Sequence, residues 1–108
     1  MLYELRIYHA MPGKLPALLK RFETATVSLF EKHGIRQVGF WTVAIGESSA
    51  DLVYILKWDS MEDRDKKFAA FQADPDWIAA RAKSEEGGPL VASISNSILM
   101  PTKFSALK

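Results

Sequence analysis

Glu4, Arg6 and Tyr8 are the residues of this sequence best placed to do chemistry. They fall at every second position of a segment, Leu2 to His9, that is typical of a β-strand, so their side chains share one face. A buried carboxylate or guanidinium needs a partner, because leaving one unpaired costs several kcal/mol. We therefore interpret the three residues as a buried ion-pair network with a structural role. The alternatives are that they line a small-molecule pocket or that they reach solvent.

Trp41, Tyr54, Trp58 and Trp77 form a second group, a large aromatic load for a short chain. Aromatic side chains mostly fill protein cores. The alternative is an aromatic wall between a sheet and its helices, since ligand pockets combine mostly apolar walls with a few polar groups. The candidate pocket joins both groups to one further arginine, and its members are Glu4, Arg6, Tyr8, Trp41, Tyr54, Trp58, Arg64 and Trp77.

Residues that usually bind metals or cofactors are sparse. There is no cysteine, and the two histidines, His9 and His33, lie at opposite ends of the first expected helix, ~30 Å apart. The acidic run from Asp59 to Asp63 lacks the spacing of a calcium loop and suits the first turn of a helix. The glycine-poor turn from Met11 to Lys14 does not resemble a nucleotide-binding loop. We predict that the protein needs no metal, haem or nucleotide.

Composition limits the class of protein. The 108 residues are 48% hydrophobic and 25% charged, with a net charge of +1, which is typical of one ordinary globular domain over residues 1–108. A net charge so small gives no reason to expect nucleic acid as a partner. A strand begins at Leu2, which leaves no room for a signal peptide, and no apolar run approaches the ~20 residues that span a membrane. We expect a cytoplasmic protein.

Hydrophobic periodicity predicts the element order β-α-β-β-α-β. The expected strands and helices are a strand over 2–9, a helix over 15–33, strands over 35–45 and 51–58, a helix over 61–73 followed by a short one with Trp77 and Ile78, and a strand over 90–100. Gly34 is expected to end the first helix, and Ser60 and Asp74 to begin the later ones. Two β-α-β units in series predict a ferredoxin-like α+β sandwich with an antiparallel sheet.

The two middle strands are apolar on both faces. In the segment 51–58, one face carries Leu52, Tyr54, Leu56 and Trp58, and the other carries Val53 and Ile55. In the segment 35–45, one face carries Ile35, Trp41, Val43 and Ile45, and the other carries Val38, Phe40 and Ala44. The helices suffice for one side only, so we expect a second copy of the sheet to cover the other. The Glu4 and Arg6 pair would then fix the register of this homodimer, although the sequence leaves open which face is outward.

Short elements in order resemble the NIPSNAP family of the dimeric α+β barrel superfamily. They are Tyr3-Glu4-Leu5-Arg6 with Tyr8, Pro12-Gly13, His33-Gly34, Val38-Gly39-Phe40-Trp41 with Gly46, Tyr54, Trp58 with Ser60, Arg64, and Asp74-Pro75-Asp76-Trp77. The resemblance implies two protomers that pack sheet against sheet, with the helices outside. It implies little chemistry, because no agreed catalytic set defines the family.

The function expected from these observations is the binding of a small apolar or aromatic ligand, or of a partner, by a dimeric α+β barrel. The alternative is a cofactor-free oxygenase or isomerase that acts on a small aromatic or polyketide-like substrate through Arg6 or Tyr8. A third possibility is an assembly module whose output is the dimer. An apolar cavity with Arg6 in its wall would favour the enzyme, and a solid core would favour the other two.

Overall fold

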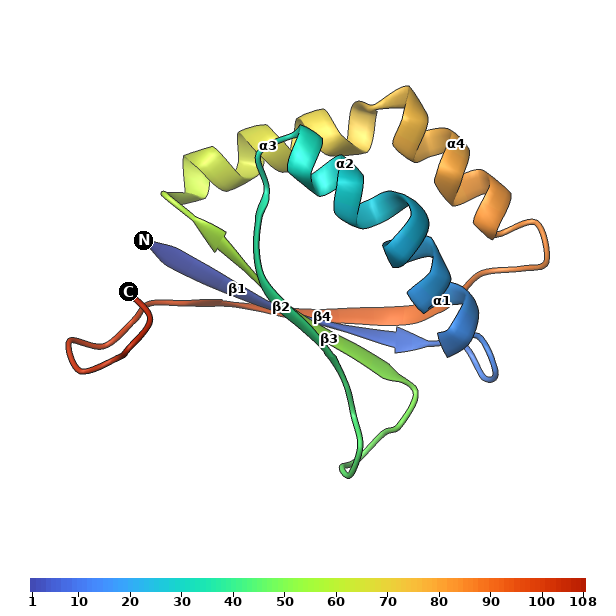
Figure 1. Cartoon of the computed structure of the whole chain (residues 1–108), viewed down its shortest axis with the longest axis horizontal. Coiled ribbons are helices and arrows are strands. Elements are labelled where there is room, and N and C mark those ends of the chain that lie inside the picture. Colours follow the sequence, from blue (N-terminus) through green and yellow to red (C-terminus); the bar gives the residue numbers. More distant parts are fainter.

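The computed structural model describes residues 1–108, and its elements follow the predicted order (Figure 1). In chain order they are β1 (Leu2–Ala10), α1 (Leu15–Arg21), the π-helical turn η1 (Phe22–Thr26), α2 (Val27–Lys32), β2 (Arg36–Thr42), β3 (Asp51–Trp58), α3 (Met61–Ala73), α4 (Pro75–Ser84) and β4 (Val91–Leu99). No helix combines the length and the apolar character that crossing a membrane requires.

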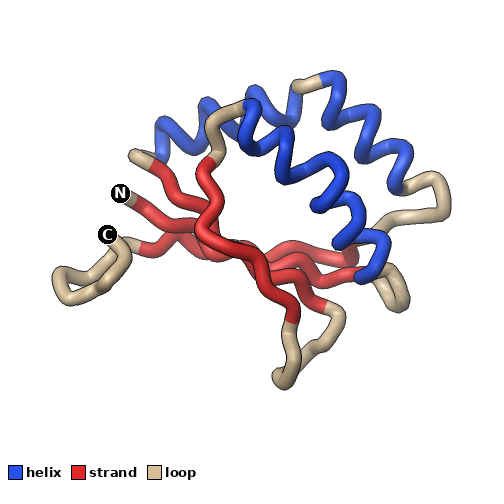
Figure 2. The backbone as a smooth tube through the Cα atoms, viewed as in Figure 1, coloured by secondary structure: helices blue, strands red, loops and turns tan.

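The four strands form one antiparallel sheet in the order β2-β3-β1-β4. All helices lie on one face of this sheet, and the other face is open (Figure 2). This is the ferredoxin-like α+β sandwich that the sequence predicts. The pairing of β1 with β3 places Glu4 opposite Leu56 and Arg6 opposite Tyr54, so the polar stripe of β1 faces the helices.

The core lies between the sheet and the helices. Its largest fully buried side chains are Leu18, Phe30, Ile35, Tyr54, Leu56 and Trp58. Every second residue of β3 is buried while the residues between are half-buried, which follows from the period of two in a strand. Val53 and Ile55 therefore point to the open face, which answers the question that the sequence leaves open.

Capping residues fix where the helices begin and end. Gly34 has a φ of +70°, and the N–H groups of Gly34 and Ile35 bond to the carbonyls of Glu31 and Phe30 at 3.1 and 2.8 Å. This is the Schellman arrangement expected of a glycine at that position. The Ser60 hydroxyl accepts the N–H of Asp63 at 3.1 Å, and Asp74 caps α4 by accepting the N–H of Asp76 at 2.8 Å. The three predicted helix boundaries are confirmed.

Two predictions about β2 are wrong. The strand ends at Thr42 rather than at Ile45, which lies in the following loop and is 99% exposed. The register of β2 against β3 shifts between Gln37 and Gly39, and an extra residue in one strand reverses the alternation of faces beyond it. Ile35 is consequently buried in the core, whereas Trp41 pairs with Val53 on the open face. The alternation rule assigned both to one face because it assumes a regular strand; Gly39, a glycine inside the strand and next to the bulge, was the signal it did not use.

The helix over 15–32 is continuous, as predicted, but its middle is π-helical from Phe22 to Thr26. Such turns are rare and frequently occur at functional sites. Here the wider turn places Arg21 and Thr26, five residues apart, in the wall of the same cavity.

Candidate functional site

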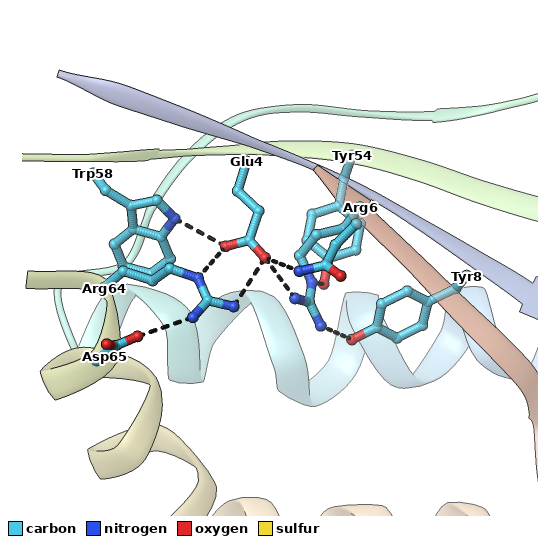
Figure 3. A network of polar contacts seen from close by, with 8 residues as sticks. Glu4, Arg6, Tyr8, Tyr54, Trp58, Arg64 and Asp65 are labelled. Atoms are coloured by element: carbon cyan, nitrogen blue, oxygen red, sulfur yellow. Dashed lines mark hydrogen bonds and ion pairs between the residues drawn. The ribbon is translucent and has the colours of Figure 1, made fainter. Parts of the chain in front are cut away.

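Glu4 is the centre of a buried polar network beneath the helices (Figure 3). Its Oε1 accepts hydrogen bonds from Arg64 Nε at 2.7 Å and from Trp58 Nε1 at 3.1 Å. Its Oε2 accepts from Arg6 Nη1 at 2.8 Å, Asn96 Nδ2 at 2.9 Å and Arg64 Nη2 at 3.1 Å. Side chains from β1, β3, α3 and β4 thus converge on one carboxylate.

These donors keep Glu4 ionised although it is fully buried. Burial alone would raise the pKa of this carboxyl, but hydrogen bonds from Arg64, Asn96 and Arg6 together lower it from 4.5 to about 2. The Glu4 carboxylate therefore pairs with two guanidinium groups, those of Arg6 and Arg64. Arg64 has a further partner in Asp65 at 3.0 Å, whose side chain is mostly exposed.

Arg6 is held on several sides at once. In addition to its bond to Glu4, Arg6 donates from Nε to the Tyr54 hydroxyl at 2.8 Å and from Nη2 to the Tyr8 hydroxyl at 3.3 Å. Its guanidinium also lies 5.0 Å from the centre of the Phe68 ring. Burial is the main cause that raises the pKa of Tyr54, so this phenol stays neutral. Three of the five guanidinium N–H groups are used in these bonds, which leaves two for another acceptor.

A cavity of about 570 Å³ adjoins this network, between the sheet and the helix layer. Its walls come from β1, the helices α1 to α4 with η1, the loop after α4, and β4. The aromatic part of the wall consists of Tyr8, Phe30, Phe68, Phe71 and Trp77. The charged part consists of Arg6, Arg21, Arg81 and Glu85. Ile94 of β4 also lines the cavity and is 47% exposed, so the cavity lies at the edge of the sheet that the helices cover least.

The predicted pocket residues divide into three groups. Arg6, Tyr8 and Trp77 line the cavity. Glu4, Tyr54, Trp58 and Arg64 belong to the network behind its wall, and Arg64 shares a smaller hollow of about 210 Å³ with Arg6. Trp41 lies on the open face, where it is 49% exposed, so its assignment to a pocket beneath the helices is wrong.

The position of the network corrects a second prediction. Glu4 and Arg6 face the helices of their own chain, so they cannot fix the register of two sheets that pack through the open face. The buried ion-pair network itself is present. It joins a strand to α3 within one chain and holds Arg6 at the cavity wall.

Sequence reasoning missed Arg21, Arg81, Glu85 and Asn96. The sequence could have indicated Asn96, because this polar residue interrupts the apolar positions along one face of β4, at the position that pairs with Arg6. The arginines had no such signal: Arg21 directly precedes a π-helical turn, which no residue type indicates, and Arg81 is an exposed residue of α4.

The two histidines have carboxylate partners. His33 Nε2 lies 2.7 Å from Asp74, the residue that caps α4. On the open face, His9 lies between Asp51 at 2.9 Å and Ser95 at 3.0 Å, which are the distances of a serine hydrolase relay. His9, Asp51 and Ser95 lie on β1, β3 and β4, so these contacts join three neighbouring strands of the sheet.

The sheet order and the one-sided helix layer define a ferredoxin-like α+β fold, with a cavity of about 570 Å³ between the two layers. The NIPSNAP family model matches residues 3–106, and the chain belongs to this family. It is similar to a NIPSNAP family protein of unknown function from Agrobacterium tumefaciens, with 31% identity, coverage of 100% of this chain and 94% of that one, and a TM-score of 0.87. An uncharacterised NIPSNAP domain protein from Burkholderia xenovorans is 26% identical over 97% and 98% of the two chains, with a TM-score of 0.84.

More distant structures share the fold alone. One, from Nitrosomonas europaea, is described as a candidate antibiotic biosynthesis monooxygenase and is 11% identical, with coverage of 94% of this chain and 98% of that one and a TM-score of 0.63. No protein with a curated description matches the chain.

Proposed function

We propose that this NIPSNAP protein binds a small molecule with a flat, apolar body in the cavity between its sheet and its helices. The observation that carries the proposal is the cavity itself. Its volume of about 570 Å³ falls within the range of ligand pockets, and its wall contains both aromatic side chains and charged groups. Phe71 and Trp77, with ring centres 4.7 Å apart, supply a surface against which a flat ligand can pack.

The network around Glu4 supports this proposal because it positions a polar group before any ligand arrives. Arg6 is fixed by Glu4, Tyr54 and Tyr8, so its remaining N–H groups have a defined direction. A long flexible side chain that is already ordered loses little entropy when a ligand binds. The buried ion pairs thus have a use beyond stability.

Matched substitutions on one exposed helix test the proposal. Ala82 lines the cavity, whereas Ala79 on the same helix does not, and both are exposed. We expect Ala82→Trp to weaken or abolish the binding of naphthalene probes, 2-naphthoate and 2-naphthamide, because the indole occupies their space. Ala79→Trp should bind them as the unaltered chain does. Nuclear magnetic resonance titration gives both affinity and location. Absence of binding to the unaltered chain, or equal binding by both variants, contradicts the proposal.

A second candidate function is catalysis by a cofactor-free oxygenase or isomerase. The predicted sign of such an enzyme was an apolar cavity with Arg6 in its wall; Arg6 does line the cavity, but Arg21, Arg81 and Glu85 line it too, so the cavity is not apolar. Arg6 and Tyr8 line the cavity together, and a guanidinium with unused N–H groups can stabilise the negative oxygen of an enolate. Oxygen uptake with anthrone, a tricyclic ketone of polyketide type, tests this candidate. The enzyme hypothesis predicts uptake that Arg6→Gln abolishes. Uptake that is absent, or unaffected by that change, counts against it.

We further propose that the open face of the sheet packs against that of a second copy. Leu5, Ile7, Val53 and Ile55 alternate with the helix-facing residues of the two central strands and remain half-buried on a face that no helix covers. A stable pair buries roughly 1,600 Å² in total. Light scattering should give twice 12.1 kDa, and Ile55→Lys, which leaves the core untouched, should give a folded chain of 12.1 kDa. A monomer at micromolar concentration before any substitution would contradict the pairing.

A further inference from the structure

We infer that the ligand of this cavity is a carboxylic acid, and that Arg21 binds its carboxylate. The inference rests on the proposed binding function and specifies the chemistry of the ligand. Two observations carry it: the excess of positive charge in the cavity wall, and a buried guanidinium with an unpaired edge.

The cavity wall contains three cations and one anion, Arg6, Arg21 and Arg81 against Glu85. Glu85 is shared, because its Oε1 lies 3.2 Å from Arg21 Nη1 and 3.5 Å from Arg81 Nε. The anion nearest to Arg6, Glu4, is shared with Arg64. The side chain of Arg81 is 62% exposed and that of Arg21 only 5%, so Arg21 is the buried cation, and it has only a share of one carboxylate. An anionic ligand would balance the wall.

Arg21 is the cation best suited to hold it. Its side chain is only 5% exposed, and Nη1 donates to Ser84 and Glu85 at 3.3 and 3.2 Å. The buried Nε has no acceptor, and Nη2 donates to no group of the protein. Nε and Nη2 form the edge of a guanidinium that holds a carboxylate by two parallel hydrogen bonds. An acceptor in the cavity can take the Nη2 proton, and a small rotation of the guanidinium adds the Nε proton.

The surroundings favour a singly charged, planar head group attached to an aromatic body. Glu85 lies on the other side of the same guanidinium, so a doubly charged phosphate would meet a carboxylate close by. Arg21 also lies over the Trp77 ring, with 5.4 Å from Cζ to the ring centre. An aromatic acid on Arg21 therefore extends naturally along Trp77 and Phe71.

Two probes of equal shape test the inference: 2-naphthoate, which carries the carboxylate, and 2-naphthamide, which is neutral. Charge-assisted hydrogen bonds predict that the acid binds the unaltered chain at least about tenfold more tightly. Arg21→Gln should remove this difference and leave the affinity of the amide unchanged. Equal binding of acid and amide by the unaltered chain would overturn the inference, while the proposed binding function would stand. Absence of binding by both would overturn the two together.

A second variant tests the inference even if Arg21→Gln fails to fold. Glu85→Gln removes the one anion of the wall and keeps the shape of the side chain. We expect this variant to bind 2-naphthoate several-fold more tightly and 2-naphthamide as before, a gain that an unfolded chain cannot produce. Weaker binding of the acid, or an equal gain for both probes, contradicts a carboxylate at Arg21.

Discussion

Replacement of Glu4 by Gln is the sharpest test of the network that supports the cavity. The substitution keeps the size of the side chain but removes its charge and turns one acceptor oxygen into a donor. Arg6 and Arg64 then lose the carboxylate they share, and an NH₂ group faces their N–H groups. Breaking a buried ion pair by altering one partner costs about 3–5 kcal/mol. The pKa of Glu4, lowered from 4.5 to about 2, independently corresponds to about 3 kcal/mol.

The loss of stability in Glu4→Gln should depend on pH. Because the folded-state pKa of Glu4 lies below the ordinary value of 4.5, its stabilisation is complete above that pH. The stabilisation falls as the pH drops and is largely lost near pH 2, where the folded chain binds the proton as well. The difference in unfolding free energy between the unaltered chain and Glu4→Gln should therefore be largest at pH 7 and should shrink between pH 4.5 and pH 2.

Urea unfolding followed by tryptophan fluorescence measures this difference, at one protomer concentration throughout, because association would shift the midpoint. Glu31→Gln is the matched control, since Glu31 is exposed and makes no side-chain ion pair, and its unfolding free energy should be unchanged. A loss below about 1 kcal/mol at pH 7 for Glu4→Gln would contradict the reasoning, because it would equal an ordinary neutral hydrogen bond. A difference that does not vary with pH would contradict it as well.

Two further substitutions test the elements that frame the site. Gly34→Ala should lower the unfolding free energy by about 1 kcal/mol in urea titrations, because Gly34 has a φ of +70° and other residues are strained there; an unchanged value would contradict the Schellman ending. Asp74→Ala should lower the melting temperature by several degrees, since Asp74 caps α4 and pairs with Lys32 and His33. Hydrogen bonds from Lys32 and His33 hold the pKa of Asp74 below its usual range. The difference in melting temperature between the unaltered chain and Asp74→Ala should therefore become smaller in acid, and a difference that is the same at all pH values would contradict that pairing.

Local signals in the sequence were sufficient for the fold. The period of two in β3, the glycine at position 34 and the serine and aspartate caps at 60 and 74 each act over a few residues, and each has the predicted consequence. The two-faced strands also predicted correctly that one face of the sheet has no helix over it.

The candidate site was predicted only in part, because its geometry depends on two local departures from regular structure. The bulge near Val38 moves Trp41 to the open face, and the π-helical turn brings Arg21 to the cavity. The π-helical turn has no composition that distinguishes it from the helix around it, and the bulge is marked only by Gly39, a glycine inside a strand. The stripe of Glu4, Arg6 and Tyr8 was recognised as buried and paired, but alternation alone cannot say which layer covers it.

Binding of an aromatic acid between the sheet and the helices can be seen in a crystal structure of the protein grown with 2-naphthoate. We expect the naphthalene rings against Trp77 and Phe71, with the carboxylate within hydrogen-bonding distance of Arg21 Nη2. A cavity closed by its own side chains, or an acid found only on the open face of the sheet, would contradict it.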